Sequence, residues 1–259
     1  MRKKYELTDE TMEWKGHTLH RIRALKNFKY TEEGNLGGWV ESEDNLSQEG
    51  NCWIYSHAKV YDNAVVMDNA DVSGDAQVYG NAVIKKEAKV SYNAKVYGNA
   101  TIEGDSLVFG NATICDNAKL LWHAEVTDHA IIADNAKVSG NAKVYDDAVV
   151  NGYAEIHDSA EVYGNAHVSE KAWVYGEARV YDDAHIYGSA QVYGISKVYE
   201  EAQVYENAKV SGDIWINGKA DVHGDVILGP AVGQLDICGT ANIESNDDVN
   251  IPRGRKTIH

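Results

Sequence analysis

A six-residue repeat governs most of the chain and constrains its fold more than any other feature of the sequence. Every sixth residue from Ala58 to Val226 gives 29 positions, and these hold Ala except at Ser106, Ser196, Ile214 and Val226. The residue two places further along is Val, Ile or Leu in every repeat, and no insertion interrupts the frame. A period of six fits neither an α-helix nor a coiled coil.

The repeat predicts a β-solenoid. The Ala and the aliphatic residue face inward and flank one outward residue, which makes a short strand, and the other three residues turn a corner. Three repeats then close a triangular coil of eighteen residues, and successive coils stack as parallel strands about 4.8 Å apart. The corners hold mostly Gly-Asn, Asp-Asn or Asp-Asp, which tolerate positive φ or hydrogen-bond their own backbone. We therefore expect an all-β, single-stranded parallel β-helix of about ten coils, in which residues eighteen apart are vertical neighbours.

Two stretches resemble known proteins. The sequence VYGNA at 78–82, 96–100 and 162–166 is similar to the repeats of the hexapeptide-repeat family, whose members form left-handed parallel β-helices. The stretch GGWVESEDNLSQEGNCWIY at 37–55, preceded by LHRIRALKNF, resembles the start of the YdcK-like proteins of bacteria and prophages. Those proteins are labelled acetyltransferases on the strength of their fold. The resemblance implies left-handed coils and an N-terminal lead-in, and it maps no catalytic residue onto this chain.

The repeat also divides the chain. We expect an N-terminal cap at 1–39, the β-helix at 40–228 and a C-terminal cap at 229–259. A stack of strands has two unpaired edges that need covering, and a hairpin around Lys15-Gly16 could cover the first. The sequence GPAVG at 229–233 breaks the frame, the rhythm resumes in a shifted phase at Leu235 and Ile237, and a basic tail follows.

The composition narrows the choice of partners. A net charge of −16 argues against direct binding to nucleic acid or to an anionic membrane, and it favours a basic protein partner. Cys52, Cys115 and Cys238 show no metal or redox spacing, which is typical of reduced thiols without a bound metal. The N-terminal residues MRKKYELTDE have no apolar stretch typical of a secretory signal, and no run approaches the ~18 apolar residues of a membrane span. We expect a cytoplasmic protein.

Catalysis is the first functional hypothesis to weigh. In hexapeptide-repeat acyltransferases, as the resemblance implies, a loop interrupts the repeats, a His between neighbouring subunits is the general base, and acyl-CoA lies along the coils. No loop interrupts the 29 repeats here. His167 and His185 occupy the same outward position eighteen residues apart, without a carboxylate in their own column nearby. We expect no catalytic residue and no cofactor; the alternative is an acyltransferase that uses His167 or His185 and acetyl-CoA.

The outside of the predicted coils carries the second hypothesis. Four tyrosines fall in one column over consecutive coils, and pairs of acids follow three of them. Stacked rings and exposed acids can be a structural ladder with a solvated face. They can also form a recognition edge for an Arg- or Lys-rich protein. The residues of this edge are Tyr145, Asp146, Asp147, Tyr163, Tyr181, Asp182, Asp183, Tyr199, Glu200 and Glu201.

We favour a non-catalytic, rigid acidic β-helix that acts as a protein-binding or scaffold module. It could be encoded by a phage or prophage and directed at a host protein or a basic, DNA-binding protein. A decoy shaped like DNA is a further alternative, although the acids here interleave with Lys instead of forming two spiral rows. Outward apolar residues such as Ile131 and Val149 share a column, and the related enzymes are trimers. A homo-oligomer, trimer or dimer, is therefore also expected.

Overall fold

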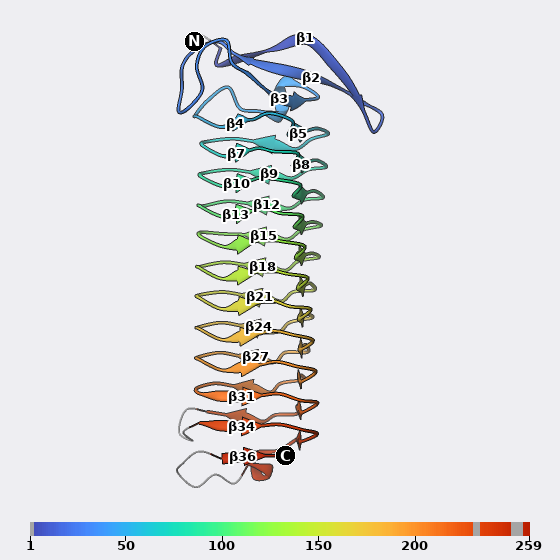
Figure 1. Cartoon of the computed structure of the whole chain (residues 1–259), viewed down its shortest axis with the longest axis vertical. Helices are drawn as coiled ribbons and strands as arrows, with labels where there is room; N and C mark the ends of the chain where they lie inside the picture. Colours follow the sequence, from blue (N-terminus) through green and yellow to red (C-terminus); the bar gives the residue numbers. More distant parts are fainter. Residues whose placement is uncertain (1–2, 230–233, 250–255) are drawn as a thin grey trace. The chain divides into compact units, whose positions relative to one another are not determined.

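The computed structural model describes residues 3–229, 234–249 and 256–259. It divides into two compact units, Met1–His123 and Ala124–His259. Within the described ranges all regular structure is β, apart from two single-turn 3-10 helices, η1 (Glu43–Asn45) and η3 (Asn246–Asp248). The same ranges contain no helix long and apolar enough to cross a membrane. The expected all-β class is confirmed, and the coils can be followed in Figure 1.

The first unit begins with an antiparallel hairpin of β1 (Tyr5–Trp14) and β2 (His17–Ala24). Strand β2 pairs antiparallel with β3 (Leu36–Val40), and β3 pairs parallel with β5, so β3 joins the hairpin to the coils. The coil strands form three parallel ladders, β3-β5-β8-β11-β14, β4-β7-β10-β13 and β6-β9-β12-β15. They are β4 (Trp53–Ile54), β5 (Lys59–Val60), β6 (Val65–Val66), β7 (Asp71–Val72), β8 (Gln77–Val78), β9 (Val83–Ile84), β10 (Lys89–Val90), β11 (Lys95–Val96), β12 (Thr101–Ile102), β13 (Leu107–Val108), β14 (Thr113–Ile114) and β15 (Lys119–Leu120).

The second unit continues the same three-sided pattern. Its ladders are β16-β19-β22-β25-β28-β31-β34-β36, β17-β20-β23-β26-β29-β32-β35 and β18-β21-β24-β27-β30-β33. The strands are β16 (Glu125–Val126), β17 (Ile131–Ile132), β18 (Lys137–Val138), β19 (Lys143–Val144), β20 (Val149–Val150), β21 (Glu155–Ile156), β22 (Glu161–Val162), β23 (His167–Val168), β24 (Trp173–Val174), β25 (Arg179–Val180), β26 (His185–Ile186), β27 (Gln191–Val192), β28 (Lys197–Val198), β29 (Gln203–Val204), β30 (Lys209–Val210), β31 (Ile214–Ile216), β32 (Asp221–Val222), β33 (Ile227–Leu228), β34 (Leu235–Ile237), β35 (Asn242–Ile243) and β36 (Lys256–Ile258).

The register of these ladders confirms the eighteen-residue coil. Lys89 pairs with Leu107 in the first unit, and Lys197 pairs with Trp215 in the second. The repeated Ala and aliphatic side chains fill the interior and are fully buried. Ser106 and Ser196 replace Ala there, and each hydroxyl donates to the carbonyl oxygen three residues earlier, at 2.7 and 2.9 Å respectively. A small hydroxyl therefore fits the Ala position because it finds an acceptor on its own corner.

The C-terminal part of the second unit shows the shifted phase. Ile214 pairs with Leu235 and Val222 pairs with Ile243, each a step of 21 residues instead of eighteen. Of the GPAVG interruption only Gly229 lies within the described residues, and of the basic tail only 256–259 do. The hand of the coils and their exact number stay predictions.

Candidate functional site

The tyrosine–acid edge lies wholly in the second unit. Its four tyrosines follow β19, β22, β25 and β28, and they form one stacked ladder. Ring centroids are 4.8 Å apart between Tyr145 and Tyr163, and 4.9 Å apart in the next two pairs up to Tyr199. The planes of neighbouring rings differ by 2–3°. Each ring is half-buried, so the phenol edges form a continuous outer rib along the coils.

The phenols of this ladder stay neutral. Burial, helped by nearby carboxylates and neighbouring tyrosines, raises the pKa of Tyr145 and Tyr181 to about 12. Burial also raises the pKa of Tyr163 and Tyr199. Each hydroxyl therefore keeps its proton at neutral pH and can donate a hydrogen bond to a ligand.

The first acid of each corner pair has a structural task. Asp146, Asp182 and Glu200 adopt positive φ of 57°, 56° and 58°. Each carboxylate accepts the backbone N–H eighteen residues later: Gly164 at 3.1 Å, Glu200 at 3.3 Å and Gly218 at 2.6 Å. An N–H bond to a carboxylate is a charge-assisted hydrogen bond, so these acids fasten one coil to the next. This bonding also offsets the repulsion between like charges stacked in one column.

The second acid of each pair contacts side chains at the surface. Asp147, Asp183 and Glu201 are exposed. The Asp147 carboxylate lies 3.8 Å from the His129 ring, and Glu201 lies 3.0 Å from the Lys219 ammonium. Asp183 accepts a hydrogen bond of 2.9 Å from the Asn165 side chain. Exposed pairs of this kind contribute little to stability, so these three carboxylates can exchange partners cheaply.

Sequence reasoning missed two further ladders in the second unit. His157, Tyr175 and Tyr193 stack at 4.8 and 4.6 Å on one corner. Tyr187, Tyr205 and His223 stack at 4.8 Å on another. The members of both ladders are eighteen residues apart in the sequence, so their spacing predicts both stacks. All three corners of the second unit therefore carry aromatic ladders, and stacking supports the coil wherever it occurs.

The candidate bases His167 and His185 are neighbours across β23 and β26. Their ring centroids lie 5.8 Å apart at an interplanar angle of 69°. The Nε2 atom of His167 lies 3.2 Å from the Asn151 side-chain oxygen, and burial together with the His185 ring lowers the pKa of His167. The imidazole of His167 is therefore neutral near pH 7, as a general base requires, but the side chain that it contacts is an amide and not a carboxylate.

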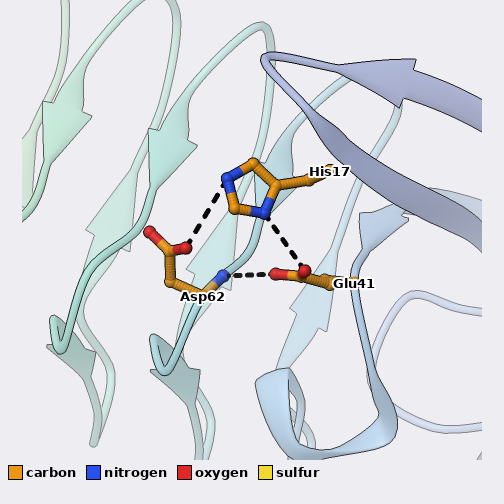
Figure 2. Close-up of side chains that lie close together, drawn as sticks. All are labelled: His17, Glu41 and Asp62. Carbon is orange, nitrogen blue, oxygen red and sulfur yellow. Dashed lines mark hydrogen bonds and ion pairs between the residues drawn. The ribbon is translucent and has the colours of Figure 1, made fainter.

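A second cluster, in the first unit, was not predicted from the sequence. His17, the first residue of β2, lies between two carboxylates in Figure 2. Its Nδ1 is 3.1 Å from Glu41 Oε1, and its Nε2 is 3.6 Å from Asp62 Oδ1. The remaining oxygens are engaged as well, because Glu41 Oε2 accepts the Asp62 N–H at 2.7 Å and Asp62 Oδ2 accepts the Gly80 N–H at 3.0 Å.

This arrangement, which we call the His17 clamp, suits a protonated imidazole better than a metal ion. One ligand atom each of His17, Glu41 and Asp62 lie within 4.8 Å of one another, which is close enough to hold an ion, but the observed contacts place one carboxylate on each ring nitrogen, as a doubly protonated imidazole requires. Hydrogen bonding to Glu41 raises the pKa of His17, and the same bond lowers the pKa of Glu41. The clamp therefore ties the β1–β2 hairpin to the first corners of the coil. The hairpin also buries Tyr61 against Leu19 and Trp39.

Comparison with known proteins agrees with this geometry. The family model described as the YdcK β-solenoid repeat matches residues 178–194. A protein of Escherichia coli (strain K12) named "Uncharacterized acetyltransferase YdcK" is 35% identical over 81 residues, which cover 28% of this chain. The match spans 23% of the length of that relative. The chain is therefore similar to YdcK over these segments, and its own eighteen-residue register shows a β-solenoid built of six-residue repeats.

Proposed function

We propose that the protein is a non-catalytic binding module whose tyrosine–acid edge docks a basic protein. The observation that supports the proposal is that the two acids of each corner pair have different bonding partners. All six corner acids are exposed, but the first of each pair accepts a backbone N–H of the next coil, whereas the second, Asp147, Asp183 or Glu201, contacts surface side chains beside a rigid rib of neutral phenols.

This surface suits an Arg- or Lys-rich partner for two physical reasons. Exposed carboxylates on a chain of net charge −16 attract a basic protein over a distance and speed its encounter. Tyrosine rings held by stacking lose little conformational entropy on binding, and tyrosine is among the residues enriched at binding hot spots. The proposal places the module in the cytoplasm, with a phage or prophage as its source and a host DNA-binding protein as a fitting target.

The test is affinity capture from a bacterial lysate with two matched variants. Asp147→Asn, Asp183→Asn and Glu201→Gln together remove three exposed charges from the edge and leave the coil-fastening acids intact. Glu177→Gln, Asp213→Asn and Asp225→Asn remove the same charge from other corners. We expect the first variant to lose basic proteins that the wild type and the second variant retain, as quantified by mass spectrometry. Equal capture by all three proteins would exclude the edge as the binding surface.

An acyltransferase is the second candidate, because the relative carries that name and His167 is a neutral imidazole. In that case acetyl-CoA would supply the acyl group, and His167 or His185 would take the proton from the acceptor amine or hydroxyl. Isothermal titration with acetyl-CoA tests this candidate, since a CoA-dependent enzyme must bind its cofactor. Absence of heat at millimolar ligand, in a preparation whose fold is verified by circular dichroism, would remove it.

Self-association belongs to the same proposal. The paired outward residues Ile131 and Val149 place apolar side chains next to each other on one face of the second unit. A dimer or trimer would cover part of this face. Sedimentation equilibrium of the wild type and of Ile131→Lys measures it: we expect an oligomer that the charged variant dissociates, and a wild-type monomer would refute it.

A further inference from the structure

A surface hollow lies at the N-terminal end of the tyrosine–acid edge. It has a volume of about 230 Å³ and lies beside Tyr145. One face of the Tyr145 ring stacks on Tyr163, whereas the preceding column position within the second unit holds Thr127 in place of a ring. Thr127 lines the hollow, and its hydroxyl donates to Asp128 at 2.7 Å. We call this feature the Thr127 hollow.

The charges around the Thr127 hollow favour a cation. Glu125, Asp128 and Glu161 line it together with Lys143, and Arg179 lies 3.2 Å from Glu161, so these three acids and two bases leave one net negative charge. Lys143 lies 3.2 Å from Glu125, while Asp128 Oδ2 accepts the Thr127 hydroxyl at 2.7 Å and the Asp146 N–H at 3.5 Å. Glu161 pairs with Arg179 on the neighbouring strand.

We infer that the Thr127 hollow receives an arginine side chain of the basic partner. This inference rests on the proposed function and names the chemistry of its anchoring contact. A guanidinium group is planar, so it can lie on the face of Tyr145 while its N–H groups reach the carboxylates around it. A lysine ammonium is a strongly hydrated point charge and would gain less from the ring face.

The size of the hollow supports a side chain over a cofactor. Sites for drug-sized molecules and cofactors usually enclose about 300–1,000 Å³, and this hollow is smaller. It also lies at one end of an aromatic rib, so a single inserted side chain would set the register of a longer partner along the edge. Anchors of this kind, an arginine packed on an aromatic ring, are typical of binding hot spots.

The experiment titrates the ¹⁵N-labelled full chain with N-acetylarginine amide and, separately, with N-acetyllysine amide. We expect saturable NMR shifts at the amides of Thr127, Tyr145 and Glu161 with the arginine probe, and at least about tenfold weaker binding of the lysine probe. Thr127→Tyr fills the hollow with a ring stacked on Tyr145 and should abolish the response. The matched control, Asn217→Tyr, adds a ring next to Tyr199 at the other end of the column and should keep it.

Should Thr127→Tyr fail to fold, the double variant Glu125→Gln, Glu161→Gln removes two of the three carboxylates and should weaken arginine binding at least about tenfold. Equal binding of both probes, shifts spread evenly along the edge, or arginine binding that survives in folded Thr127→Tyr would overturn the inference. The outcome is separable from that of the proposed function. Lysate capture that depends on Asp147, Asp183 and Glu201 would still support the edge if the hollow bound no arginine.

Discussion

Removing one ring from the middle of the tyrosine ladder should cost more stability than removing one from its end. Tyr181 stacks on two rings, Tyr163 and Tyr199, each at 4.9 Å. Tyr199 stacks on Tyr181, and the next residue of its column is Asn217. An aromatic pair contributes about 0.5–1.5 kcal/mol beyond the area it buries. Tyr181→Ala should therefore lose about 1–3 kcal/mol of stacking free energy, and Tyr199→Ala about half of that.

Amide hydrogen exchange is the suitable assay, because stacked repeats can open locally and a single unfolding midpoint would average over them. The reporter amides are those of Tyr163 and Tyr181, which donate to the carbonyl oxygens of Val180 and Val198 at 3.0 Å. Tyr181→Phe is the control and should stay within about 0.5 kcal/mol of the wild type, because it keeps the ring. Equal losses in Tyr181→Ala and Tyr199→Ala would show that stacking adds nothing beyond the burial of each ring, and the structural account of the ladder would fail.

Three further predictions follow from single contacts. His17→Gln should remove a pH dependence from thermal unfolding. Because the pKa of His17 is raised in the folded protein, the clamp stabilises the wild type fully below the ordinary histidine pKa of ~6.5 and loses this contribution as pH rises through the folded pKa. Identical pH profiles of the variant and the wild type would contradict the clamp. Asp146→Ala should lower the free energy of unfolding in urea by about 1–3 kcal/mol because the Gly164 N–H loses its carboxylate acceptor. Asp147→Ala should change it by less than about 0.5 kcal/mol. Equal effects would refute the different roles of the two corner acids. Ile156→Ala removes a fully buried side chain and should cost about 2–5 kcal/mol in the same assay, and a loss below about 1 kcal/mol would show that the interior collapses around the gap.

The coil itself was predictable because its period is simple. Ala and an aliphatic residue at fixed positions of a six-residue repeat predict short sides with an inward face, and pairs such as Glu161 with Arg179 confirm that three sides make one coil. The same rule placed Tyr145 beside Tyr163, and the observed stack follows from it directly. Periodic sequence therefore determined both the backbone and the column order of the edge.

Features that depend on docking of the N-terminal hairpin were not predictable in this way. His17 and Glu41 lie 24 residues apart, and Asp62 lies 21 residues further along, so no multiple of eighteen relates the three. Their meeting depends on the turn at Lys15-Gly16 and on how the hairpin packs over Tyr61. Tertiary contacts of this kind leave no periodic signal in the sequence.

The corner acids show what the eighteen-residue spacing can and cannot predict. The spacing places Asp146 and Asp147 on one edge but does not distinguish their roles, because it predicts where a residue lies and not which hydrogen bonds it makes. In the structure the residue at positive φ accepts a backbone N–H of the next coil, whereas Asp147 lies 3.8 Å from the His129 ring. The first corner position is constrained by its positive φ, which glycine such as Gly164 also meets, and an acid there additionally accepts the N–H of the next corner. The second position carries no such demand, and a binding preference could be encoded at Asp147, Asp183 and Glu201 without weakening the coil.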